Sequence, residues 1–452
     1  MKNCDLEINC SKHPESELDV QQLKIMITNA KVMDGGLFTS SYVNYGIYTK
    51  QLESTVERRF SDFFWLRSIF VRDFVGVYVA LFKFKIPPIP QKSIKKYEKE
   101  FLESRFDGLQ KFLNTVAEHP ELRRSPALVG FLKLTDSTQF QEFKNEIDAI
   151  LPPFDFIPKH LSLEAFEDFS SKCLRSVSGV CRVRLNKDLH QYSVQAENML
   201  NSSEESYDRL KKLSLELCKG LEKVSCTLAS MAEEIGELET INKNFNETVD
   251  EGKWSDVGSL YNDLNERINC WGHQMEKTSL IVKEHLFKTF KYSRKECEAA
   301  IQMINVRNEC GQAYFGAVKH LSEEKDILLD KKDPSKWRLD PKVSNEKIAP
   351  EDLLKNRNLA KHFMMPEKRE ALNQMRLTFG FLNELMVKEM TWLGGYKAMR
   401  YAKSIGNMNT EKIEILDEER RASHAILERI KSQLPILVEQ MSINAESSTP
   451  AT

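Results

Sequence analysis

The chain has 452 residues, 29% of them charged, with a net charge of −2 and only 18 glycines. This length allows two or three domains, the near-neutral charge excludes a general attraction to nucleic acid, and high charge with few glycines favours long helices. Residues 20–133 differ from the whole, because they contain 18 lysines and arginines against 11 aspartates and glutamates. A basic first domain favours a partner rich in phosphate.

Several classes of protein are disfavoured by what the sequence lacks. The nine cysteines include no Cys-x-x-Cys pair and no cluster at zinc spacing, which predicts reduced thiols in the cytosol and no metal site. The first residues lack the apolar core of a signal peptide, and no apolar run approaches the roughly 20 residues that cross a bilayer. Phosphate-loop, dinucleotide and nucleophile-elbow motifs are missing. We therefore predict a non-enzymatic protein without a cofactor, whose membrane contact is peripheral.

The first part of the chain predicts an α+β domain over residues 21–136, after a disordered stretch at 1–20. Alternation from Leu23, a run rich in β-formers at 42–48 and a third run at 55–60 predict a three-stranded antiparallel sheet. Ser61 or Asp62 is expected to cap a helix that ends near residue 71. Two further helices are predicted at about 95–118 and 126–133, with an extended proline-rich piece before them.

The second part predicts an all-α elongated bundle. A linker at 137–187 is followed by a helical dimerisation domain at 188–441 and a disordered tail at 442–452. Apolar residues recur every three and four positions in three segments, beginning at Leu210, Leu260 and Leu372, as in a coiled coil. Helices of 60–70 residues span on the order of 90–100 Å, so we expect their apolar stripes to need a second copy for full burial.

The chemistry of the first domain points to a phosphorylated ligand. Arg58-Arg59-Phe60, the run Pro87-Pro88-Ile89-Pro90-Gln91-Lys92 and Arg105 combine three cationic positions, an aromatic ring and a rigid spacer. Arginine binds phosphate through a planar fork of donors, and lysine binds it as a point charge. Arg-Arg-Phe alone is typical of surface charge on a strand, and Pro-Pro-x-Pro alone of a linker. Their conjunction is more specific.

These motifs, with Phe101-Leu102-Glu103-Ser104-Arg105 and Leu109-Gln110-Lys111-Phe112-Leu113, resemble the phox-homology (PX) domain over about residues 20–135. A PX domain followed by three long helices resembles the layout of the sorting nexins that carry a BAR domain. The resemblance implies that Arg59 holds the 3-phosphate of phosphatidylinositol 3-phosphate and Phe60 packs under the inositol ring. It also implies that Lys92 meets the 1-phosphate and Arg105 the ring hydroxyls. Arg58 is assigned a supporting role.

Residues Val79 to Lys85 lengthen the connection before the proline run beyond what is usual in PX domains. Two interpretations stay open, a membrane-touching loop and a benign local insertion. If the extension refolds the loop, Lys92 is the contact that it affects.

Two more segments are candidates for membrane contact. The linker carries an apolar stripe with basic neighbours, which is typical of an interfacial helix or of a helix docked on the bundle. The interval 331–366 reads as a mobile basic tip. The candidate residues are Phe166, Phe169, Lys172 and Arg175 in the linker, and Lys331, Lys332, Lys336 and Arg338 in the tip.

The favoured hypothesis is a sorting nexin that binds phosphatidylinositol 3-phosphate on the cytosolic face of early endosomes and senses or induces curvature. Its partners would be the anionic membrane surface, a second copy or another sorting nexin, and retromer-like or cargo proteins, but no nucleic acid. The alternative is a PX and coiled-coil scaffold that tethers cargo without bending the membrane.

Overall fold

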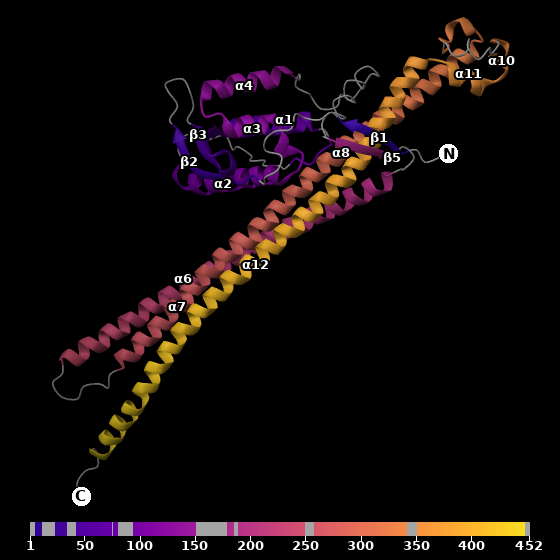
Figure 1. The fold of residues 1–452 in the computed structure, drawn as a ribbon. Helices are drawn as coiled ribbons and strands as arrows, with labels where there is room; N and C mark the ends of the chain where they lie inside the picture. The colour runs from indigo at the N-terminus through magenta and orange to yellow at the C-terminus, as the bar shows by residue number, and fades with distance from the viewer. Residues whose placement is uncertain are drawn as a thin grey trace. The chain divides into compact units, whose positions relative to one another are not determined.

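The computed structural model describes residues 5–10, 23–33, 42–74, 76–79, 94–150, 179–184, 189–248, 257–340 and 350–447. They fall into two compact units, shown together in Figure 1. The first unit comprises residues 1–201 and 295–393, and the second comprises 202–294 and 394–452. Each unit is described by itself.

The first unit contains the predicted three-stranded antiparallel sheet. Strands β2 (Ile25–Met33), β3 (Tyr42–Thr49) and β4 (Ser54–Arg59) pair in that order, and the short 3-10 helix η1 (Lys50–Leu52) joins β3 to β4. The register places Ile27 opposite Ile47, and Ile47 opposite Val56. All three side chains are buried, so the alternation that predicts the sheet also fixes which face meets the core.

Helices α1 (Phe60–Asp73), α2 (Ile94–Glu118) and α3 (Pro126–Lys133) follow the sheet, with the 3-10 helix η2 (Leu122–Arg124) before α3. Their bounds lie within two residues of the predicted segments, but the N-cap of α1 is Arg59 in place of the predicted Ser61 or Asp62. Phe63 of α1 meets the rings of Tyr45 and Phe131 edge-on, at centroid distances of 5.9 and 5.1 Å. The Gln110 side chain of α2 pairs with the backbone of the β2 edge through Ile25 O and Ile27 N–H.

A further helix, α4 (Ser137–Ile150), packs onto this domain where a linker was predicted. In Figure 1 it lies beside α3. The Trp65 indole meets the Phe140 ring edge-on at 5.8 Å and donates to Asp148 Oδ1 at 3.1 Å. Gly130 lies so close to the Phe143 ring that a Cβ there would be 2.2 Å from it. The folded domain therefore extends through α4.

The N-terminal segment corrects the prediction of disorder over residues 1–20. Asp5–Cys10 forms strand β1, which pairs antiparallel with β5 (Gly179–Arg184), inside the stretch predicted as an amphipathic helix. The register places Asp5 opposite Arg184 and Glu7 opposite Arg182. The period-two pattern of residues 5–10 was the missed signal.

The rest of the first unit is built on the long helices. These are the start of α6 (His190–Thr248), most of α8 (Lys288–Asp330) and the start of α12 (Pro366–Ser447). Asn383 of α12 accepts from Arg307 Nε on α8 at 2.5 Å, and the Arg307 guanidinium lies 4.6 Å from the Phe379 ring centre. Helix α12 has 82 residues, about 120 Å of rise, and reaches residue 447 in place of the tail predicted from 442.

The connection between α8 and α12 is a packed cap where a mobile tip was predicted. The 3-10 helix η4 (Pro334–Lys336) and helices α10 (Pro350–Lys355) and α11 (Arg357–Phe363) surround Trp337, which is fully buried and donates to Leu328 O at 3.1 Å. An isolated bridge joins Leu339 to Met364. The predicted mobility rested on prolines and lysines, but the interval also supplies apolar residues for a core of its own: Trp337, Leu353, Ala360, Phe363, Met364 and Met365.

The second unit is a helical bundle. Helix α7 (Gly258–Ile281) continues through the π-helical turn η3 (Val282–Phe287) into α8, and α6, α7 and α12 run side by side (Figure 1). Ser225 of α6 donates to Gly272 O on α7, and Arg267 of α7 bonds to Glu419 of α12 at 2.9 Å. Contacts that lie later in the sequence of α7 are made to residues that lie earlier in α6 and earlier in α12. Helix α7 is therefore antiparallel to both.

Helix α6 presents two faces of different character. Its small residues pack inward; Ser214, Cys218 and Ala232 are buried. Its large apolar residues lie on an exposed stripe at heptad spacing: Leu210, Leu217, Val224, Met231, Leu238 and Phe245, between 39% and 49% exposed. We call these six residues the α6 stripe. Within the described residues, the predicted seam is therefore largely open to solvent.

Candidate functional site

Arg59 stands where β4 ends and α1 begins. Its backbone N–H donates to Asp62 Oδ2 at 3.0 Å, which caps the first turn of α1, and its side chain is 53% exposed. An exposed guanidinium beside a helix N-terminus combines a forked donor with the positive end of the helix dipole. This position suits an anion such as a phosphate group.

Phe60, which follows Arg59 in the sequence, is in contact with Arg105. The Arg105 guanidinium of α2 lies 4.4 Å from the centre of the Phe60 ring, a cation–π contact. Burial raises the pKa of Tyr45, and the charge of Arg105 beside its hydroxyl opposes that rise. The fold thus brings Arg105 of α2 onto Phe60, the residue that follows Arg59 at the start of α1.

Arg58 points away from this site into the protein, and its contacts support the predicted structural role. It is 2% exposed and donates to the carbonyls of Phe131 at 3.0 Å, Leu134 at 2.5 Å and Glu57 at 2.8 Å. Its guanidinium lies 3.8 Å from the Phe140 ring centre. Burial lowers its pKa to about 10, so it stays charged at neutral pH. Arg58 ties β4 to the end of α3 and to α4.

Other predicted residues have different outcomes. Several candidates lie outside the described residues. These are Lys92, the segment from Ala80 to Lys85, and the linker residues Phe166, Phe169, Lys172 and Arg175. Lys331, Lys332, Lys336 and Arg338 are exposed on the cap, and Lys336 pairs with Asp333 at 3.2 Å.

The contact of the first domain with α12 was missed by sequence reasoning. Glu389 Oε2 accepts from the Tyr78 backbone N–H at 3.1 Å and lies 2.8 Å from His119 Nε2. The His119 and Trp392 rings meet at 4.5 Å, and Lys388 bonds to Glu121 at 3.1 Å. These residues are more than 250 positions apart in sequence, and no local pattern signals the pairing.

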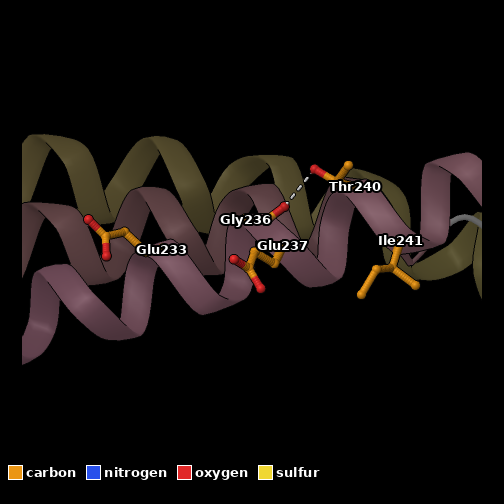
Figure 2. A pocket seen from close by; sticks show the side chains of 5 residues that line it. All are labelled: Glu233, Gly236, Glu237, Thr240 and Ile241. Atoms are coloured by element: carbon orange, nitrogen blue, oxygen red, sulfur yellow. Dashed lines mark hydrogen bonds between the residues drawn. The ribbon is translucent and has the colours of Figure 1, made fainter.

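A shallow hollow on α6 does not suit an anion. Figure 2 shows Glu233, Gly236, Glu237, Thr240 and Ile241 around it, with the Thr240 hydroxyl donating to Gly236 O at 2.9 Å. Two carboxylates and no cation line it, so it would repel phosphate. Within the described ranges no group of three or more His, Cys, Asp or Glu side chains is placed to hold a metal ion, and no helix has the length and apolar content needed to span a membrane.

Comparison with known proteins identifies the domain that contains these residues. Residues 47–135 match the PX domain family. Sorting nexin 1 of Arabidopsis thaliana is 28% identical over 223 residues, which cover 46% of this chain and 52% of that protein. Sorting nexin-12 of Homo sapiens is 35% identical over 94 residues, 19% of this chain and 53% of that protein. This chain therefore contains a PX domain. In the matched regions it is similar to sorting nexins.

The matched regions are only part of each relative, about half the length of these two proteins. Sorting nexin MVP1 of Saccharomyces cerevisiae is 26% identical over 235 residues, 51% of this chain and 39% of that protein. The cryo-EM structure of the SNX-BAR Mvp1 tetramer has 18% identity, with a TM-score of 0.48, and the match covers 87% of this chain and 99% of that one. That similarity is too low to assign the fold of the long helices, which rests here on their own contacts.

Proposed function

We propose that the protein binds membranes containing phosphatidylinositol 3-phosphate through Arg59, Phe60 and Arg105, with Lys92 as a fourth contact. The observation that carries the proposal is the Arg105–Phe60 contact at the start of α1, where the preceding residue, Arg59, is exposed. Arg59 supplies the fork for the 3-phosphate. Phe60 supplies an apolar surface for the inositol ring, and Arg105 supplies donors for its hydroxyls.

We further propose that the long helices form a dimer. The α6 stripe supports this, because six large apolar residues at heptad spacing are exposed where a coiled coil would bury them. The partner is a second copy or another sorting nexin. Two phosphoinositide sites on one dimer raise the apparent affinity, because the second binding event takes place at a high effective concentration.

The basic cap is the second proposed membrane contact. Lys331, Lys332 and Arg338 are exposed together on the cap, and each such side chain near an anionic leaflet contributes about 1 kcal/mol. The linker residues Phe166, Phe169, Lys172 and Arg175 remain candidates for the same role. Dimer, pocket and cap together describe a peripheral protein of early endosomes that senses or induces curvature in sorting and transport, with retromer-like or cargo proteins as further partners.

A non-curving scaffold is the second candidate. Such a scaffold uses the same PX domain for membrane targeting and the helices as a straight tether for cargo. The length of α12 favours neither reading over the other, because a tether and a curvature device both need long helices.

Vesicle binding tests the proposed function. The purified chain is mixed with phosphatidylcholine vesicles that contain or lack phosphatidylinositol 3-phosphate, and bound protein is separated by flotation. We expect binding only with the phosphoinositide, and tubules visible by electron microscopy at high coverage. Binding that ignores the lipid would contradict the pocket. Binding without any tubules would favour the scaffold.

A further inference from the structure

Lys144 of α4 lies against the carboxylate that stands beside the phosphate-binding arginine. Asp62 is 7% exposed, and its Oδ1 accepts from Lys144 Nζ at 3.0 Å. The same Oδ1 lies 3.8 Å from Arg59 Nε. Lys144 therefore donates to Asp62 Oδ1, the oxygen that Arg59 would otherwise approach more closely.

A bare carboxylate at this place would oppose phosphate binding. It would attract the Arg59 guanidinium and turn its donors inward, and its charge would repel an incoming phosphate. With Lys144 in place, the carboxylate and the ammonium form a neutral pair, and the Arg59 side chain stays 53% exposed. The second Asp62 oxygen, Oδ2, is used by the Arg59 backbone N–H.

The position of Lys144 is fixed by α4 and not by chance at the surface. Its side chain is 11% exposed and its ammonium lies 5.5 Å from the Trp65 ring centre and 5.6 Å from that of Phe140. The Arg58 guanidinium also makes a cation–π contact with the Phe140 ring. Asp62 therefore has three cationic neighbours, Arg58, Arg59 and Lys144. Arg58 and Lys144 are buried against aromatic rings.

We propose that Lys144 is a positioning residue for the phosphate site, which acts by neutralising Asp62 and leaving Arg59 free for the headgroup. The proposal deepens the proposed phosphoinositide function and rests on it. It also assigns a role to α4, which lies beyond the matched residues 47–135. Lys144 touches Asp62 and not the ligand, so its effect must disappear when the Asp62 charge is removed.

A double-mutant cycle tests this dependence. The full chain is prepared as Lys144→Gln, Asp62→Asn and the double variant, with Lys144→Arg as the charge-preserving control and Lys133→Gln as a control lysine on α3. Binding of soluble inositol 1,3-bisphosphate is measured by calorimetry, and binding to phosphatidylinositol 3-phosphate vesicles by flotation. Thermal unfolding of each variant shows that the fold is retained.

We expect Lys144→Gln to weaken binding by about two- to tenfold, since one partly buried ion pair is removed. Lys144→Arg and Lys133→Gln should bind like the natural chain. In the Asp62→Asn background, Lys144→Gln should have no further effect. If Arg59→Ala still weakens binding, a loss of the same size in that background, or no loss in either background, would overturn this proposal and leave the proposed function standing. If the unaltered chain binds neither probe, the proposed function and this inference both fail.

Discussion

The carboxylate of Glu389 on α12 lies 2.8 Å from Nε2 of His119, and both side chains are at most 2% exposed. His119 directly follows the end of α2 in the PX domain, and Glu389 belongs to a long helix of the same unit. The pair is completed by the Tyr78 backbone N–H, which donates to the same oxygen. A buried, fully bonded carboxylate joins the PX domain to the helix that follows 250 residues later.

Glu389→Ala should loosen this junction. Removing the carboxylate leaves the His119 Nε2 and the Tyr78 N–H without their partner, at a cost of about 1–3 kcal/mol for each buried group. We expect a lower thermal unfolding midpoint and faster proteolysis between the PX domain and α12. Glu414→Ala, an exposed glutamate on the same helix, is the control. Equal midpoints for the two variants would contradict the junction.

Substitutions of the neighbouring residues Arg58 and Arg59 should have different effects: we expect loss of Arg58 to lower stability and loss of Arg59 to weaken binding. Arg58→Ala leaves three backbone carbonyls without their donor, at a cost of about 1–3 kcal/mol for each buried group. We expect a strong loss of stability in urea unfolding. Arg59→Ala should unfold like the natural chain, because its side chain is half exposed. Similar unfolding midpoints for both variants would argue against the buried role of Arg58.

The α6 stripe predicts a dimer, and charged residues introduced on the stripe should dissociate it. Leu217→Glu with Val224→Glu places two carboxylates on the stripe, and we expect a monomer by sedimentation velocity where the natural chain is a dimer. Lys223→Glu is the matched control, since it changes the net charge by the same two units but lies off the stripe and is exposed. A natural chain that sediments as a monomer at micromolar concentration would contradict the dimer.

Cys310 reports on the packing of α8 against α12. The thiol is fully buried, and burial raises its pKa to about 12. The reactive thiolate therefore forms only as the pH approaches that value, and at pH 8 we expect no alkylation of Cys310 by iodoacetamide in the native chain. Cys226 on α6 is exposed and should react. Mass spectrometry of the alkylated peptides distinguishes them, and rapid labelling of Cys310 would show that α8 is open.

The PX domain was predictable because its signals are local. Alternation set the strands, Asp62 marked the start of α1, and Pro126 marked that of α3. Arg59, Phe60 and Arg105 were proposed through their motif, and the fold places Arg105 against Phe60. Strand β1 was missed, although its period-two pattern is visible, because a six-residue strand needs its distant partner β5 to form.

The long-range contacts could not be predicted in the same way. Lys144 and Glu389 each act on a residue at least 80 positions away, and nothing in their own neighbourhood marks them. The cap between α8 and α12 was mistaken for a mobile tip, because its prolines and lysines hid the apolar residues that surround Trp337. The α6 seam was seen, but only the structure separates the small residues that pack inward from the large ones that stay exposed.

Flotation of Arg59→Ala with phosphatidylinositol 3-phosphate vesicles tests the central claim most directly. Loss of a bidentate charged contact should weaken binding about ten- to a hundredfold, while Lys133→Ala, which removes a lysine elsewhere on the PX domain, should bind like the natural chain. That pair of results would support a phosphoinositide pocket at the start of α1. Equal binding of Arg59→Ala and the natural chain would contradict it.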